Sequence, residues 1–181
     1  MDRALTMAAL ALCLATAACG KAPEEAASVG PGEPVPNATI NEFMRLQAEP
    51  AAEAIWGSVR VVSNASGIHE YRPSGEAQWQ ALDEAADTLV ALAAFVAEDG
   101  RALVRPGVAL EAGGTLDTPA IQARIAAHRD LFVEKARAFG ARAEEVRTAI
   151  RARDADRLLE VGGPLQEACE SCHLEFYYPG G

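Results

Sequence analysis

The chain has 181 residues and a formal net charge of −10, from 16 Lys and Arg against 26 Asp and Glu. Half of the residues are hydrophobic and only 6% are aromatic. Alanine is the commonest apolar residue, which favours helices over strands, so we predict a single, mainly α-helical domain. An acidic chain without a block of Lys and Arg has no electrostatic means of holding a phosphate backbone, which argues against nucleic-acid binding.

The N-terminal segment has the features of an export signal. Arg3 precedes an apolar run that ends on the small residues Ala17 and Ala18. The run from Ala4 to Ala18 is shorter than the roughly 20 residues that a membrane-spanning helix needs. We therefore prefer a cleaved signal peptide over residues 1–18 to a retained transmembrane anchor.

Cys19 follows these small residues directly, which resembles the lipobox of bacterial lipoproteins, with Thr16 in place of the usual Leu. The resemblance implies that Cys19 is lipidated and anchors the protein to a membrane from the periplasmic side. Gly20 and Lys21 lack the Asp that retains such lipoproteins at the inner membrane, which favours the outer membrane. Residues 19–37 are then a lipidated cysteine and a Pro-rich linker, and 38–181 are the folded domain.

The first predicted helix begins at a capping box formed by Thr39 and Glu42. Its apolar residues recur at spacings of three and four as far as Val62. Pro50 lacks an N–H group, so we expect a kink at residues 48–51. Residues 63–75 are polar and contain glycine and proline, which predicts a loop.

Three more helices are predicted. They cover residues 76–98, residues 118–153 with Thr118 as N-cap and a bend at Gly140, and the segment after Asp154, kinked or divided at Pro164. Residues 101–118 form a long connection across the surface or the end of the helices. Four amphipathic helices predict an all-α fold, a four-helix bundle. The apolar stripes are as follows: Met44, Ala48, Ala51, Ile55, Val59, Val62; Trp79, Leu82, Ala86, Leu89, Ala93, Val96; Ile121, Ile125, His128, Phe132, Ala136, Phe139; Leu158, Gly162, Leu165, Cys169, Cys172, Phe176.

Two cysteines remain in the predicted domain, and they form a motif with the next residue. Cys169 and Cys172 are followed directly by His173, which is the spacing of c-type haem attachment. On a helix, positions i and i+3 share a face, so two thiols can bond to the two vinyl groups of one haem while the histidine at i+4 binds the iron. The predicted cofactor is one covalently bound haem c.

Three other interpretations of the cysteines were weighed. A redox dithiol is typical of a βαβ thioredoxin pattern, which is missing from the sequence. A zinc site needs a fourth ligand, such as His69 or His128. A disulfide between residues three apart in a helix has poor geometry. We therefore prefer haem attachment.

The motif near the end of a fourth helix resembles the class II c-type cytochromes, the cytochrome c′ and cytochrome c556 group. Met44, Pro50, Trp56, Trp79 and Tyr177 add a similarity to a group of proteobacterial cytochrome lipoproteins. The resemblance covers about residues 39–178. It implies a haem within the bundle, attached to the C-terminal helix, with His173 as fifth ligand and Met44 facing the sixth position. Glu175 and the residues after it replace the basic residue that the family carries there.

The resemblance implies a non-enzymatic carrier of single electrons in the periplasm, with an unidentified redox partner and with a homodimer left open. Met44 as a ligand would raise the reduction potential, whereas Met44 as a core residue would only shield the iron. His128 is the main competing ligand. The alternative function is a five-coordinate haem that binds NO or CO. A peroxidase ranks third, because the first helix offers only Glu42 and Arg45 as acid or base groups.

Overall fold

The computed structural model describes residues 37–110, 113–178 and 180. The predicted signal peptide, Cys19 and residues 20–36 of the linker lie outside the described residues. The described chain is mostly helical, with one small two-stranded sheet. In the part that is described, no helix is both long enough and apolar enough to cross a membrane. In chain order the elements are α1 (Ile40–Phe43), the π-helix η1 (Met44–Ala48), α2 (Glu49–Ser58), β1 (Arg60–Asn64), β2 (Gly67–Tyr71), α3 (Glu76–Ala97), α4 (Thr118–Ala127), α5 (Arg129–Arg151) and α6 (Ala155–Phe176).

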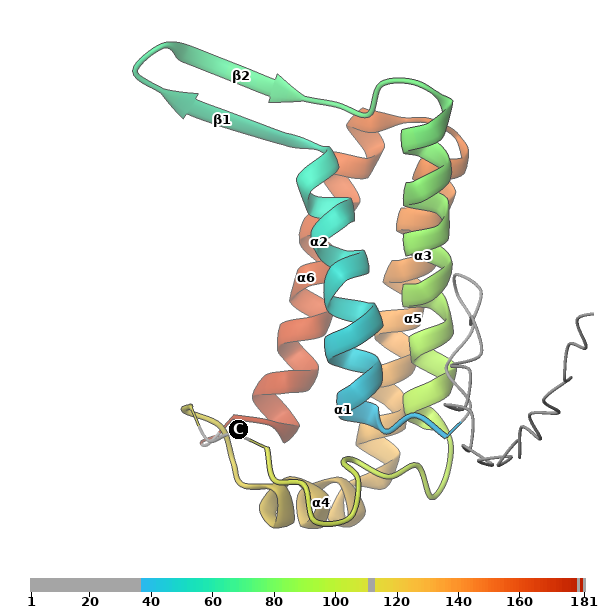
Figure 1. Ribbon diagram of the computed structural model, residues 1–181, viewed down its shortest axis with the longest axis vertical. Coiled ribbons are helices and arrows are strands. Elements are labelled where there is room, and N and C mark those ends of the chain that lie inside the picture. The colour runs from blue at the N-terminus through green and yellow to red at the C-terminus, as the bar shows by residue number, and fades with distance from the viewer. Residues whose placement is uncertain (1–36, 111–112, 179, 181) are drawn as a thin grey trace, which may run out of the picture.

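The long helices lie side by side around one core (Figure 1). α1, η1 and α2 follow one another in a single rod. Helix α3 packs on α5, α5 packs on α6, and α2 contacts both α3 and α6. The short helix α4 lies across one end, and the hairpin β1–β2 projects from the other end (Figure 1). Fully buried side chains from the four long segments form the core: Phe43, Ile55, Leu89, Val146, Ile150, Leu158, Val161 and Leu165.

The first rod begins as predicted, but the expected kink is replaced by a wide turn. The capping box is confirmed, since Thr39 N–H donates to Glu42 Oε2 at 2.9 Å and Glu42 N–H donates to Thr39 Oγ1 at 3.2 Å. The prediction of a kink at residues 48–51 was wrong, because Pro50 lies in the first turn of α2 and the backbone stays helical there. One turn earlier the chain widens into η1, where Glu49 N–H donates to the carbonyl of Met44, five residues back.

The wide turn changes which residues share the buried face. Phe43 and Ala48 are both buried and are five residues apart, a spacing that a π-turn brings into register and an α-helix does not. The predicted stripe used Met44 in place of Phe43. In the structure Met44 is half-buried at the edge of the core, and Leu46, on the outside of the turn, is 70% exposed.

The loop predicted over residues 63–75 was wrong for residues 63–71, because residues 60–71 form an antiparallel hairpin. Arg60 pairs with Tyr71, and Asn64 pairs with Gly67 across a two-residue turn. Asn64 Oδ1 accepts hydrogen bonds from the N–H and the hydroxyl of Ser66 and so closes that turn. Val62 therefore belongs to a strand and not to the first helix, which ends at Ser58.

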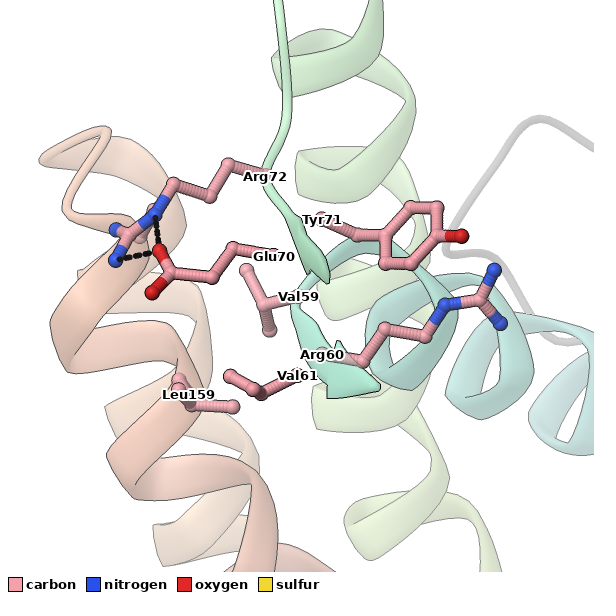
Figure 2. A pocket seen from close by; sticks show the side chains of 8 residues that line it. Val59, Arg60, Val61, Glu70, Tyr71, Arg72 and Leu159 are labelled. Atoms are coloured by element: carbon pink, nitrogen blue, oxygen red, sulfur yellow. Dashed lines mark hydrogen bonds and ion pairs between the residues drawn. The ribbon is translucent and has the colours of Figure 1, made fainter. Parts of the chain in front are cut away.

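The hairpin contacts the helices only at its base. Figure 2 shows the side chains where it meets the first turns of α6, including Val61 and Leu159. Arg72 bridges Glu70 on the hairpin and Asp156 on α6, with Nη2 to carboxylate distances of 3.3 and 2.7 Å. The hollow between these side chains measures ≈ 10 Å³, which is room for about one water molecule.

The predicted third helix is two helices. His128 leaves the helical region with φ −126° and ψ 42°, and it separates α4 from α5. The expected bend at Gly140 does not divide α5, because Gly140 lies inside the continuous helix Arg129–Arg151. The N-cap is also one residue earlier than predicted. Asp117 Oδ1 accepts from the N–H of Ala120 at 2.8 Å, while the Thr118 hydroxyl accepts from the N–H of Leu110.

Helix α6 begins as predicted and is not divided. Asp154 Oδ1 accepts from the N–H of Arg157 at 2.9 Å, which confirms the N-cap. Pro164 lies inside the continuous helix Ala155–Phe176. Beside it, Trp56 Nε1 on α2 donates to the carbonyl of Gly162 at 3.3 Å. A Cβ at Gly162 would lie 3.6 Å from Trp56 Cδ1, an ordinary van der Waals contact.

Candidate functional site

The Cys-x-x-Cys-His motif forms one turn near the C-terminal end of α6. Cys169 and Cys172 are half-buried, are not joined by a disulfide, and pack against the core. They lie on the same helix face as Leu165 and Phe176, whose side chains are buried, with 0% and 3% of their surface exposed. Both sulfur atoms therefore belong to the inner face of the helix. From there each thiol is available to form one thioether bond.

Burial is the main electrostatic influence on the two thiols. It raises the pKa of Cys169 to about 11, with a smaller rise from the neighbouring Cys172. Burial likewise raises the pKa of Cys172 to about 11, partly offset by the charge of Lys135. The motif also lies at the C-terminal end of its helix, where the helix dipole disfavours a thiolate. Disulfide exchange requires a thiolate, so this environment does not favour the redox-dithiol interpretation.

His173 is half-buried and its ring lies beside two aromatic side chains. The centroid of the His173 ring is 5.8 Å from that of the Tyr177 ring and 6.5 Å from that of the Tyr178 ring. Burial lowers the pKa of His173 below its ordinary value. The imidazole is therefore held neutral at pH 7, which is the form that binds a metal through a ring nitrogen.

The helix periodicity indicates which neighbour His173 faces. Eleven residues separate Gly162 from His173, which is close to three turns of an α-helix, so the two share one side of α6. That is the side on which Trp56 of α2 contacts Gly162. His173 therefore lies on the side of α6 that is turned toward the first helical rod.

Met44 lies on that first rod, in η1. It is half-buried and packs against the core. The rod carries η1 at the same end of the molecule as the last turns of α6 (Figure 1). The structure thus brings Cys169, Cys172 and His173 together on one turn, and it places Met44 on a separate element at the same end.

The long connection after α3 closes this end, in agreement with the sequence prediction. Its first part is bonded to the start of α1, through Ile40 N–H to Ala102 carbonyl at 2.9 Å and Asn41 N–H to Leu103 carbonyl at 3.0 Å. Its last part is bonded to the end of α6, through Leu116 N–H to Tyr177 carbonyl at 2.9 Å. The connection therefore ties together the two elements that carry Met44 and the motif.

Both additional histidines are exposed. His69 is exposed on the hairpin, at the opposite end of the molecule, and its Nε2 is 2.9 Å from Ser66 Oγ. The prediction that His128 lies on an apolar stripe was wrong, because it is exposed at the break between α4 and α5. Within residues 37–110 and 113–178, no group of three or more His, Cys, Asp and Glu side chains is arranged to hold a metal ion.

One residue that the sequence analysis did not single out, Lys135, contacts the motif turn. Lys135 Nζ on α5 donates to Ser171 Oγ, between the two cysteines, at 2.5 Å. The rings of Phe132 and Phe176 meet edge to face at 5.1 Å one turn away, which fixes the antiparallel register of α5 and α6. The sequence held a signal for this contact. Phe132 and Ala136 belong to one predicted apolar stripe and Phe176 to another, and aligning these two helices antiparallel with Phe132 beside Phe176 brings Lys135 close to Ser171.

Comparisons with family models, with curated proteins and with solved structures found no match to this chain.

Proposed function

We propose that this protein is an exported monohaem c-type cytochrome of the class II type that transfers single electrons. The observation that carries the proposal is the arrangement on α6. Two half-buried, unpaired thiols lie three residues apart on the inner helix face, and a neutral histidine follows them directly. The side-by-side helices fit a four-helix bundle that encloses one face of the haem.

The residues present fit a covalently attached haem. The thiols are shielded among apolar residues, as thioether bonds to a porphyrin edge require. Thr115 adds a buried hydroxyl that has no hydrogen-bond partner among the described residues, next to Leu116 and its bond to Tyr177. An unpaired buried hydroxyl is costly, and a bound polar group at this end would satisfy it.

Each residue then has a separate task. The haem supplies an iron that changes its oxidation state by one electron. Cys169 and Cys172 would hold the group on α6, and His173 would bind the iron through a neutral imidazole. Met44, on the rod that His173 faces, would be the second protein ligand. The connection between α3 and α4 ties the two ligand-bearing elements together and so limits ligand exchange.

An optical spectrum tests the proposal. Residues 20–181 are expressed in the periplasm of a host with the c-type haem maturation machinery, and spectra are recorded oxidised and reduced, before and after CO. We expect a low-spin spectrum, a covalent pyridine haemochrome and little response to CO. The matched control is Cys169→Ser with Cys172→Ser, which we expect to carry no covalent haem. Covalent haem equal to wild type in the control would refute the proposed attachment.

Met44→Ala separates the two ligation states. With Met44 bound, we expect the substitution to remove the sulfur-to-iron band of the ferric form and to allow rapid CO binding. A wild type that is high-spin, binds CO at once and does not change on Met44→Ala would instead show a five-coordinate haem. That result would replace electron transfer by NO or CO binding as the proposed function.

We infer in addition that Cys19 carries a lipid which holds the protein at a membrane, the outer membrane in preference. The motif at Ala17–Cys19 supports this inference. The test is cell fractionation of full-length protein and of Cys19→Ser, both detected by haem stain. We expect wild type in the outer-membrane fraction and the variant in the soluble periplasmic fraction, whereas equal fractionation would contradict the anchor.

A further inference from the structure

Lysine is rare in this chain, and one of its two lysines contacts the motif. The sequence contains Lys21 and Lys135, and the other basic residues from 37 to 181 are arginine or histidine. Lys135 lies on α5 with a half-buried side chain, and its Nζ bonds to Ser171 Oγ at 2.5 Å. A positive charge is thus fixed beside the turn that carries both cysteines.

The surroundings of that charge are negative. From residue 165 to 178, α6 and the residues after it contain Glu167, Glu170 and Glu175 and no Lys or Arg. The carbonyl end of the helix dipole adds a partial negative charge.

Two arginines near this end are held in ion pairs elsewhere. Arg105 bonds to Glu42 at 2.5 Å, and Arg129 bonds to Asp99 at 3.0 Å. Each of these ion pairs involves a carboxylate outside α6. Lys135, by contrast, is hydrogen-bonded to a residue of the motif itself.

We propose that Lys135, held in place by Ser171, is the fixed positive charge that raises the reduction potential of a haem attached at Cys169 and Cys172. The inference rests on the proposed function. Reduction adds one electron and takes the iron from Fe(III) to Fe(II), so the reduced centre carries one positive charge fewer. A nearby cation therefore stabilises the reduced form relative to the oxidised form. Because the ammonium is half-buried, solvent and salt screen it less than a surface charge.

The test compares three variants of the haem-loaded protein in equilibrium redox titrations. Lys135→Met removes the charge at similar side-chain length, Lys135→Arg keeps the charge, and Ser171→Ala removes the partner that holds it. We expect Lys135→Met to shift the midpoint potential to more negative values and Lys135→Arg to stay near wild type. Ser171→Ala should fall between them. The matched control is Arg137→Met, an exposed cation on the same helix, which should leave the potential unchanged.

A second readout does not depend on electron transfer. Acetylation of Lys135 by a water-soluble reagent, followed by mass spectrometry, should be slower in wild type than in Ser171→Ala, since the hydrogen bond holds the amine. Equal potentials in wild type and Lys135→Met would overturn the inference, as would equal shifts in Lys135→Met and Lys135→Arg, which would indicate a packing role. Failure of the proposed function gives a different result, namely a wild type without covalent haem.

Discussion

The close contact between α3 and α5 depends on a missing side chain. A Cβ at Gly140 would lie 2.7 Å from Cβ of Ala93, closer than two carbon atoms can approach without displacement. We predict that Gly140→Ala lowers the free energy of unfolding by about 1–3 kcal/mol through overpacking. This loss exceeds the gain of about 1 kcal/mol that alanine gives in a helix. Urea unfolding followed by circular dichroism measures the change.

Gly57 is the matched control, because it lies in the last turn of α2 and a Cβ there meets nothing within 4 Å. Gly57→Ala should therefore raise the free energy of unfolding by up to about 1 kcal/mol. If Gly140→Ala proved as stabilising as Gly57→Ala, the helices would not approach as closely as described. The comparison separates packing from helix propensity, since both glycines lie inside helices.

The buried thiols make the haem-free protein sensitive to alkaline pH. Their pKa values of about 11 lie above the ordinary value of 9.0. Between pH 9 and 11 the folded state keeps protons that the unfolded chain has released, so its stability falls as the pH rises through this range. We predict a loss on the order of 2 kcal/mol per thiol, less for the second because the two interact.

Urea midpoints of reduced protein at intervals from about pH 8 to 11 measure this loss. The variant with Cys169→Ser and Cys172→Ser lacks both thiols and should show a flatter profile over the same range. The two proteins differ only at the two cysteines, so the difference between the two curves isolates the thiols. Parallel curves would mean that the thiols are as exposed in the folded protein as in the unfolded chain.

At the scale of the elements, η1 accommodates one residue more than an α-helical turn would. Deleting the exposed Leu46 would leave Phe43 and Ala48 four residues apart, which suits a continuous α-helix. We predict that this deletion changes the free energy of unfolding by less than about 1 kcal/mol. Deleting the exposed Glu53 in α2 is the control, because it turns Phe43 away from the core that contains Ile55. That deletion should cost about 2–5 kcal/mol, and equal costs for the two deletions would contradict this account of the wide turn.

The long helices could be predicted because apolar residues at spacings of three and four indicate a helix with one buried face. Trp79 and Leu89 of α3, or Leu158 and Leu165 of α6, recur at intervals that no other element would bury together. The caps at Thr39 and Asp154 could also be predicted, because their side chains act on the next turn of the same chain. These features depend on local chemistry alone.

The remaining features depend on contacts that a spacing pattern does not record. The hairpin has no buried face, since Val61 and Ile68 are 55% and 72% exposed, so the alternation that signals a strand is missing. The π-turn could not be predicted, because Met44 is an apolar residue four before Ala48 and the pair fits the spacing of an ordinary α-helix. Within the candidate site, the Cys-x-x-Cys-His motif could be identified from its sequence spacing. The contact of Lys135 with Ser171 could not, because it depends on how α5 and α6 are aligned.

The whole molecule has two distinct ends. At one end the hairpin projects from the helices, and at the other α4 and the long connection lie beside the motif (Figure 1). Arginine ion pairs link the outer faces of α3 and α5, for example Arg151 with Asp83 at 2.7 Å and Arg147 with Asp87 at 3.0 Å. Exposed pairs of this kind contribute little to stability. The fold therefore depends mainly on the shared apolar core.

The connection between α3 and α4 is the one covalent link between two halves of the fold. The first half carries Met44 and ends with α3, and the second half begins at α4 and carries the cysteines and His173. Residues 105–109 of the link are exposed, so a chain break there removes no core contact. Separately produced segments 37–107 and 108–181 should associate through α3 and α5, regain helical circular dichroism on mixing and elute together on gel filtration. Because Met44 and His173 would then come from different polypeptides, an iron bound by both would make the metal itself part of what joins the two halves.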